Sequence, residues 1–331
     1  MKKVLCLSLV LGLRLAGAAE PPGYYDPASG LTGAVLRTAL HDIIKGHTVI
    51  GYTATRTPLE MIDQDPANSA NLILLYERAS SPKSFFVNGN NGGWNREHCW
   101  PNSLGIDDAL PAYSDLFNLR ACGSISNSDR DNLYYDESTV GAAGYEIPSG
   151  STSPLCSQDS DSWEPPDEVK GDLARSMFYM DIRYEGGGSE PNLVLTENVA
   201  SISTNNANMG RISTLLIWHF LDPVSPAERT RAEGAFNYQG NRNPFVDRPA
   251  WVEAIYGEVF KLIAIPSGNT LTLSWPAVVP AGMGFIETST DLVHWQSVAL
   301  TIVDVAGKHT ASVPLSPAPR YYRLKLSTRP G

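Results

Sequence analysis

The spacing of apolar residues changes near residue 265, and this change constrains the fold more than any other feature of the chain. Before that point apolar residues recur every three or four positions, which predicts helices. The clearest helical runs are 31–44, 167–178 and 213–221, with a capping pattern at 225–228 and a last helix near 247–257. A short helix followed by a strand is expected within 58–76, and 94–100 reads as extended chain.

After residue 265 the apolar residues follow a period of two, and Pro, Gly and Asp separate the runs, which predicts short strands. The five runs are 271–275, 284–288, 295–300, 310–313 and 321–326. We therefore expect an α+β protein with a mainly helical domain at 20–264 and a small all-β sandwich domain at 265–331. The second part resembles fibronectin-like modules, and it contains no cluster of reactive residues.

The N-terminal residues 1–19 have the pattern of a signal peptide. Lys2 and Lys3 precede an apolar run, and Ala16-Gly17-Ala18 offers the small residues of a cleavage site. No later stretch is long and apolar enough to span a membrane. We expect a secreted protein, extracellular or periplasmic, with a buried N-terminal strand as the alternative interpretation of this run.

The charge differs between the two parts. Residues 20–264 contain 17 Lys and Arg against 32 Asp and Glu, a net charge of −15, whereas residues 265–331 contain 5 against 3, a net charge of +2. Proteins that bind nucleic acid through a broad surface are usually basic there. Any nucleic-acid function of this chain must therefore depend on a local site.

The chain has four cysteines, of which Cys6 lies in the expected signal peptide. Cys99, Cys122 and Cys156 would reach an oxidising compartment, where one disulfide and one thiol are expected. The sequence leaves three pairings open. We favour Cys122–Cys156, because it would anchor the long loop of residues 136–165.

Two dense polar segments, 95–103 and 127–132, stand out from the rest of the chain. Hydrolysis of a phosphodiester requires a base for water and a hard cation on the phosphate oxygens. His98 can supply the base, while Glu97 and Asn127 offer the oxygen ligands that Mg²⁺ prefers. Turns and helix caps are the alternative explanation. A thiol nucleophile at Cys99 is disfavoured, because neighbouring side chains on extended chain point to opposite faces.

These segments belong to a longer series of motifs, which resembles the bacterial endonuclease I family over roughly residues 30–257. The motifs are Arg96-Glu97-His98-x-x-Pro101-x-Ser103, Asp115-Leu116-x-Asn118-Leu119, Asn127-x-x-Arg130-x-Asn132, Gly171 to Met180, Trp218-His219, and Gln239 to Asp247.

The resemblance implies a ββα-metal (His-metal finger) site, with His98 as general base and Asn127 on the finger helix. Glu97 and Asn127 would hold one Mg²⁺ ion, with Mn²⁺ and Ca²⁺ as alternatives. Such nucleases cut DNA, and often RNA, with little sequence preference and leave 5′-phosphates. Because adjacent Glu97 and His98 must face one site, we expect the strand to break or bulge there.

Further residues are assigned by their place in these motifs. Asp115, Asn118 and Asn132 are expected to support the site. The candidates for holding phosphate are Arg96, Arg120, Arg130 and Arg242, because a guanidinium can bind two phosphate oxygens at once. His219 lies on an apolar helical face and is interpreted as a packed structural residue.

Two other functions are compatible with the sequence. One is a catalytically inactive binding protein that retains the nuclease fold and attaches to a surface or polymer through residues 265–331. The other is a hydrolase of a different phosphodiester. The intact set of Glu97, His98 and Asn127 favours the nuclease.

Overall fold

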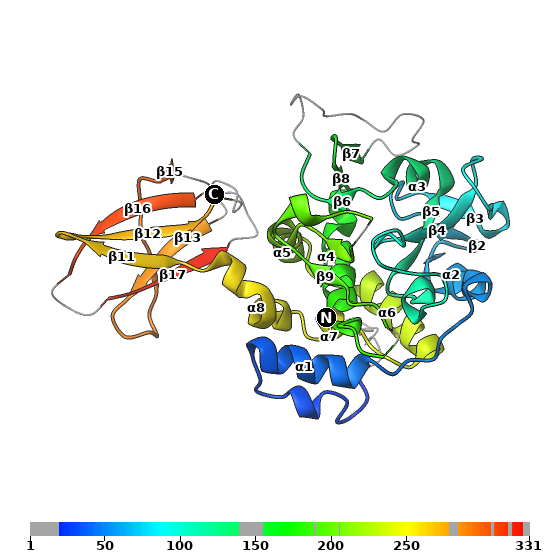
Figure 1. Cartoon of the computed structure of the whole chain (residues 1–331), viewed down its shortest axis with the longest axis horizontal. Helices are drawn as coiled ribbons and strands as arrows, with labels where there is room; N and C mark the ends of the chain where they lie inside the picture. The colour runs from blue at the N-terminus through cyan, green and yellow to red at the C-terminus, as the bar shows by residue number, and fades with distance from the viewer. Residues whose placement is uncertain are drawn as a thin grey trace, which may run out of the picture.

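The structure is a computed structural model that describes residues 20–138, 155–188, 190–204, 206–277, 284–305, 308–316 and 320–326. The expected signal peptide at 1–19 lies outside the described residues. Both helices and strands are present, as the α+β prediction requires (Figure 1).

Helices are the predominant regular elements in the described chain before residue 261. The α-helices are α1 (Gly33–Ile44), α2 (Arg56–Ile62), α3 (Ser124–Arg130), α4 (Asp167–Arg183), α5 (Ile212–Leu221), α6 (Pro226–Gln239), α7 (Pro244–Asp247) and α8 (Ala250–Tyr256). The 3₁₀ turns are η1 (Asp26–Ala28), η2 (Tyr52–Thr55), η3 (Lys83–Phe85), η4 (Pro111–Ser114), η5 (Val199–Ser201) and η6 (Gly257–Phe260). Among the described residues, no helix combines the length and apolarity that crossing a membrane requires.

Short strands are inserted between these helices. They are β1 (Gln64–Asp65), β2 (Asn68–Ile73), β3 (Ser80–Pro82), β4 (Trp94–His98), β5 (Leu119–Gly123), β6 (Tyr134–Tyr135), β7 (Ser157–Gln158), β8 (Ser162–Glu164), β9 (Val194–Leu195) and β10 (Asn208–Met209). They form small sheets in the orders β1-β2-β3, β4-β5, β6-β8-β7 and β10-β9.

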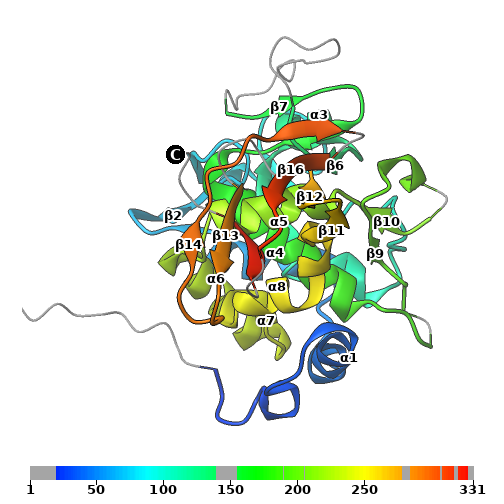
Figure 2. The same ribbon diagram turned by 90° about the vertical axis from the view of Figure 1, so that its left-hand side faces the viewer.

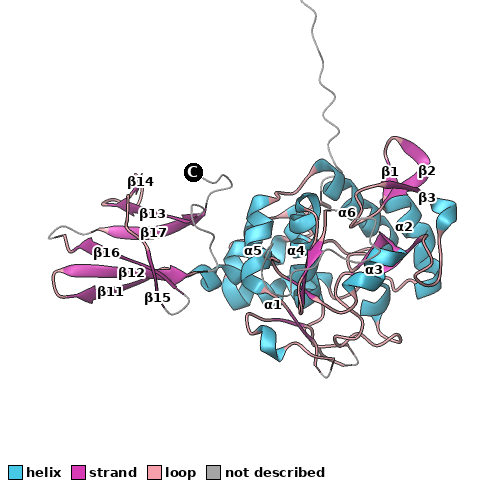
Figure 3. Cartoon of the chain, turned by 90° about the horizontal axis from the view of Figure 1, so that it is seen from above, coloured by secondary structure: helices cyan, strands magenta, loops and turns pink. Residues whose placement is uncertain are grey.

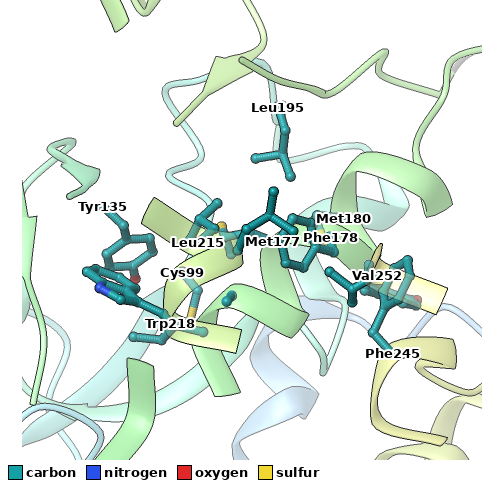
Figure 4. Close-up of a cluster of buried hydrophobic side chains, with 14 of the residues drawn as sticks. Cys99, Tyr135, Met177, Phe178, Met180, Leu195, Leu215, Trp218, Phe245 and Val252 are labelled. Atoms are coloured by element: carbon teal, nitrogen blue, oxygen red, sulfur yellow. The ribbon is translucent and has the colours of Figure 1, made fainter. Parts of the chain in front are cut away.

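Helix α4 forms the centre of the core. It is buried along almost its whole length and packs against α5, α1 and α7. Figure 4 shows Met177 and Phe178 of α4 beside Leu215 of α5 and Phe245 of α7. Burying each such side chain contributes about 1.5–3 kcal/mol, so this layer stabilises the fold.

Local sequence explains where the helices begin and end. Ser225 caps α6, since its hydroxyl accepts a hydrogen bond from the Glu228 N–H at 3.1 Å, and Pro226 occupies the first helical position. Gly240 ends the helix with a φ of 82°, a left-handed conformation that glycine adopts without strain. The predicted cap at Ser225 and the proline at the first helical position are confirmed. The second half of the predicted capping box is not formed, because the Glu228 carboxylate binds Arg175 instead.

Strands β4 and β5 form a regular antiparallel ladder that leads directly into α3. The register runs from Trp94 opposite Gly123 to His98 opposite Leu119 without a shift. The expected break or bulge at 97–98 is therefore wrong: the pairing stays regular, and the strand simply ends at His98. Because β5 ends at Gly123 and α3 begins at Ser124, the helix is held against the end of the ladder.

The C-terminal strands lie at one end of the molecule, next to α8 (Figures 1 and 3). They are β11 (Ile263–Ser267), β12 (Thr270–Pro276), β13 (Gly284–Ser289), β14 (Gln296–Ser297), β15 (Val303–Val305), β16 (Lys308–Pro314) and β17 (Tyr321–Leu326). Two antiparallel sheets result, in the orders β11-β12-β16-β15 and β14-β13-β17.

All five predicted strands are present, although β14 is shorter than expected. Two strands were not predicted, because β11 and β15 are exposed along their whole length and lack the alternation that marks a half-buried strand. Figure 2 views the molecule from the side of these strands. A cavity of about 320 Å³ separates β17 from α8 and η6; Glu253, Phe260 and Arg323 are among its lining residues.

The expected disulfide is not formed. In the described part of the chain Cys99, Cys122 and Cys156 are buried and none is in a disulfide. The Cys122 Sγ lies 3.4 Å from the Gly123 carbonyl, and the Cys156 Sγ lies 3.7 Å from the Tyr76 carbonyl. The Cys122–Cys156 prediction is thus corrected: both residues pack in the core as thiols.

Candidate active site

The β4–β5 ladder and α3 bring the main predicted site residues together. Arg96, Glu97 and His98 are the last three residues of β4, and Asn127 lies on α3, which packs against both strands. The ladder and helix lie close together in Figure 1. Segments about thirty residues apart in the sequence therefore form one local cluster.

Glu97 is buried, with only 2% of its surface exposed. Its Oε1 accepts hydrogen bonds from the Tyr76 hydroxyl at 2.7 Å and from the Arg130 Nη1 at 3.0 Å. Burial raises the pKa of Glu97, and the neighbouring Arg130 charge opposes that shift. Both side-chain hydrogen bonds reach the same oxygen, and the backbone N–H of His98 also stabilises the charged carboxylate.

Arg130 connects α3 to the end of β4. Its Nη1 also donates to the His98 carbonyl at 2.9 Å, and its Nη2 donates to the Cys99 carbonyl at 2.7 Å. The side chain is 1% exposed, and the guanidinium lies over the ring of Tyr135. This guanidinium binds a carboxylate and two carbonyls and so holds the site together. Its Nε makes no hydrogen bond but is buried, so phosphate cannot reach it from solvent.

His98 is fixed by one hydrogen bond and one stacked ring. Its Nε2 donates to the Tyr113 carbonyl at 2.8 Å, since a carbonyl can only accept. The ring of Tyr52 is stacked on the imidazole at 5.5 Å with an interplanar angle of 16°. Because the proton is on Nε2, Nδ1 carries the lone pair that a general base needs. Burial lowers the pKa of His98 to about 4, so the free imidazole is neutral at neutral pH.

The amide of Asn127 is oriented by two acceptors. Its Nδ2 donates to the Asn95 Oδ1 at 2.8 Å and to the Arg96 carbonyl at 3.2 Å. This arrangement assigns the nitrogen to the side of β4 and turns Oδ1 away from it. Asn127 thus presents an oxygen in a fixed direction.

The donor set fits a hard cation better than zinc. Among the described residues no group of three or more His, Cys, Asp or Glu is arranged to hold a metal. A carboxylate oxygen of Glu97 and an amide oxygen of Asn127 match Mg²⁺, which keeps several of its waters and needs few protein ligands. Zinc normally takes three or four His, Cys or carboxylate ligands.

Comparison with known proteins decides the family. Residues 32–250 match the endonuclease I family. The chain belongs to the endonuclease I family. It is 43% identical over 242 residues to the extracellular ribonuclease of Bacillus amyloliquefaciens, covering 72% of this chain and 80% of that protein. It is 40% identical over 251 residues to the extracellular ribonuclease of Bacillus subtilis (strain 168), covering 75% and 83%. The match to endonuclease-1 of Buchnera aphidicola is 30% over 133 residues, covering 40% and 44%.

Because it belongs to this family, the chain is a nuclease. Two of its predicted phosphate ligands, Arg120 and Arg242, lie among carboxylates. Arg120 is buried, and its nearest carboxylates are Asp172 at 3.5 Å and Asp63 at 3.9 Å. Arg242 is buried with Asp247 at 2.7 Å and Glu233 at 2.8 Å. These two arginines, like Arg130, stabilise the fold, and we no longer assign them to phosphate.

Arg96 differs from those three arginines. Its guanidinium lies 3.8 Å from the ring centroid of Tyr52, and Nη1 donates to the Tyr52 carbonyl. Within the part of the chain that the structure describes, Arg96 makes no ion pair and its Nε and Nη2 make no hydrogen bond. It is the one predicted phosphate ligand of this nuclease that is available for the role.

The three predicted supporting residues have different roles. Asp115 is fully buried, and its Oδ2 accepts hydrogen bonds from Tyr179 and Tyr184, which makes it a core residue. Asn118 makes two hydrogen bonds to the Trp100 backbone and so fixes the chain that follows His98. Asn132 accepts a hydrogen bond from Ser103 and thereby joins the two polar segments.

Sequence reasoning missed four residues that position the site. Tyr52 stacks on His98, Tyr113 binds it through a carbonyl, Tyr76 binds Glu97, and Asn95 orients Asn127. Only Asn95 had a signal, since it lies in the polar segment 95–103. Burial raises the pKa of Cys99 to about 12, which argues against this thiol as the nucleophile.

We predict that Arg130→Met destabilises the fold, because it leaves Glu97 buried without its cation. Breaking one partner of a buried ion pair costs about 3–5 kcal/mol. Urea unfolding measures the loss, and Arg229→Met on the surface of α6 is the control. An Arg130→Met protein as stable as wild type, with only weaker substrate binding, would restore the phosphate assignment.

Proposed function

We propose that this protein is a secreted, Mg²⁺-dependent endonuclease that hydrolyses phosphodiester bonds in DNA and also in RNA, with little sequence preference. His98 is the general base, and Glu97 and Asn127 hold one ion. The observation that carries the proposal is the Nε2–H···O=C hydrogen bond from His98 to Tyr113, which leaves Nδ1 unprotonated.

In the proposed reaction, His98 Nδ1 removes a proton from a water molecule. The water oxygen forms a bond to phosphorus, and the bond from phosphorus to the 3′-oxygen breaks. The 3′-oxygen then takes up a proton from solvent, and the phosphate stays on the 5′-oxygen of the downstream fragment. The stacked ring of Tyr52 keeps the imidazole in one orientation while this proton moves.

Glu97 Oε2 and Asn127 Oδ1 would be the two protein ligands of the ion. When bound, Mg²⁺ neutralises charge on the phosphate and on the leaving oxygen. The charge of Arg130 opposes the rise in the pKa of Glu97 that burial causes, and Asn95 would keep Asn127 from turning its nitrogen to the ion. Arg96 would bind a phosphate oxygen beside them.

The elements β4, β5 and α3 correspond to the two strands and the helix of a ββα-metal finger. Their order in the chain and their packing support this assignment. In the regular ladder, Glu97 contacts Tyr76 and Arg130 while His98 contacts Tyr52 and Tyr113. His98 is the last residue of the strand and has 9% of its surface exposed. Substrate would have to reach the imidazole through that exposed edge.

The two Bacillus relatives bear the name extracellular ribonuclease, which supports RNA as a substrate. Water is the nucleophile in the proposed reaction, and the 2′-hydroxyl takes no part. The same site can therefore cut DNA and RNA, because the group that distinguishes them is not used.

Export and the C-terminal strands belong to the same proposal. Residues 1–19 would be removed as a signal peptide, in line with the extracellular names of the relatives. Residues 265–331 would form a β-sandwich, since Trp275 and Ile286 from its two sheets are buried. This module would attach the enzyme to a surface or polymer.

We predict that His98→Ala lowers turnover by about 10²–10⁴, the usual contribution of a positioned general base. Plasmid nicking with Mg²⁺, with and without EDTA, measures it. His294→Ala, at an exposed position among the C-terminal strands, is the control and should behave as wild type. Near-normal nicking by His98→Ala would exclude the mechanism, and nicking of plasmid by wild type in EDTA would exclude the metal.

A separate prediction concerns the ion. Glu97→Gln and Asn127→Ala should each shift the midpoint of a Mn²⁺ titration upward by about tenfold or more, since even outer-shell partners are worth about 10- to 100-fold. Isothermal titration without substrate gives the midpoint, and Asn102→Ala, an exposed neighbour, is the control. Midpoints equal to wild type in both variants would remove the ligand assignment.

A further inference from the structure

Most cations of this acidic protein are already paired. Among the 17 Lys and Arg of residues 20–264, nearly every one has a carboxylate within 4 Å. In the described chain the exceptions in this range are Lys83, Arg96 and Arg229. Of the three, Arg96 belongs to the candidate active site, and the Lys83 carbonyl contacts Trp94 at the other end of the same strand β4.

A stack of alternating cations and rings ends at His98. Arg56 lies 4.6 Å from the ring centroid of Phe86, and Arg96 lies 5.3 Å from the same ring and 3.8 Å from the ring of Tyr52. Tyr52 in turn is stacked on His98. We call Arg56, Phe86, Arg96 and Tyr52 the stacked strip.

The turn η3 extends this strip. Its Lys83 carbonyl accepts a hydrogen bond from the Trp94 indole at 3.1 Å, which fixes the turn against β4. The last residue of the turn, Phe85, is 57% exposed, although it directly precedes the partly buried Phe86. Phe85 thus lies next to a lysine that has no carboxylate partner, although the Lys83 Nζ donates a hydrogen bond to the Gln64 Oε1 at 2.7 Å.

The rings of Tyr52 and Phe86 are already covered by Arg96, His98 and Arg56, so the exposed ring of Phe85 is the one left to stack on a base. An exposed ring beside cations suits one form of nucleic acid. A single strand offers the faces of unpaired bases and a flexible line of phosphates, and base–ring stacking does not depend on base identity. A duplex offers its phosphates but keeps its bases stacked on one another. The cations here are few, so affinity must come largely from stacking.

We propose that the stacked strip, with Lys83 and Phe85, binds single-stranded nucleic acid next to the phosphate that is cut. Phe85 stacks on an unpaired base, and Lys83 and Arg96 contact phosphates. This inference rests on the proposed function and adds its substrate class: a single strand, or a strand unwound near the cut.

The test compares Phe85→Ala and Lys83→Ala with two matched controls on α6. Tyr238→Ala removes an exposed ring, and Arg229→Ala removes the third cation without a carboxylate partner. Each protein is given a short DNA strand, alone or in duplex with its complement. Binding of the labelled strands is measured by fluorescence anisotropy in EDTA, and KM and kcat are measured with Mg²⁺.

Phe85→Ala should weaken single-strand binding and raise the single-strand KM about 5- to 30-fold, with a smaller effect on the duplex. Lys83→Ala should reduce the slope of log affinity against log salt by about 0.7 on the single strand. Both controls should match wild type. Equal effects of Phe85→Ala on the two substrates, or no effect on either, would overturn the proposal.

The two proposals fail in different ways. Suppose that wild type cuts neither substrate but binds the single strand, and that Phe85→Ala weakens this binding. The proposed single-strand site is then supported, and the proposed reaction is wrong. If wild type cuts nucleic acid while Phe85→Ala binds the single strand normally, the reaction stands and the strip is wrong.

Discussion

The buried guanidinium of Arg130 is the interaction on which the site depends. It connects α3 to the end of β4 by binding Glu97 and the carbonyls of His98 and Cys99. A buried carboxylate without a cation would take up a proton, since burial disfavours its charge. Arg130 therefore does two things at once: its charge opposes the rise in the pKa of Glu97, and its hydrogen bonds tie the helix that carries Asn127 to the end of β4.

The arrangement of charge explains how an acidic protein can act on a polyanion. Carboxylates neutralise most of its arginines inside the fold, so those cations contribute stability and give little attraction to phosphate. What attraction there is comes from a few groups at the active site, with Arg96 held between the rings of Tyr52 and Phe86. A local site of this kind does not require a basic surface.

The sequence predicted the helices, the cap at Ser225 and the C-terminal strands well, because apolar spacing and capping are local signals. It also identified the cluster at 97–98 and 127. Contacts between distant segments were not predictable. His98 binds the backbone carbonyl of Tyr113, and every residue type has such a carbonyl, so the sequence gives no sign of this contact. Arg120 and Arg242 were assigned to phosphate for the same reason, since a sequence shows a cation without showing its partner.

The central claim is that a water molecule activated by His98 cuts the chain, and the ends of the products test it most directly. A short RNA strand is cleaved with Mg²⁺, and the new termini are identified by mass spectrometry. The account predicts 5′-phosphate and 3′-hydroxyl ends, the same as on DNA, because the 2′-hydroxyl takes no part. New 5′-hydroxyl ends with 2′,3′-cyclic phosphates would contradict it, since those products require attack by the 2′-hydroxyl in place of water.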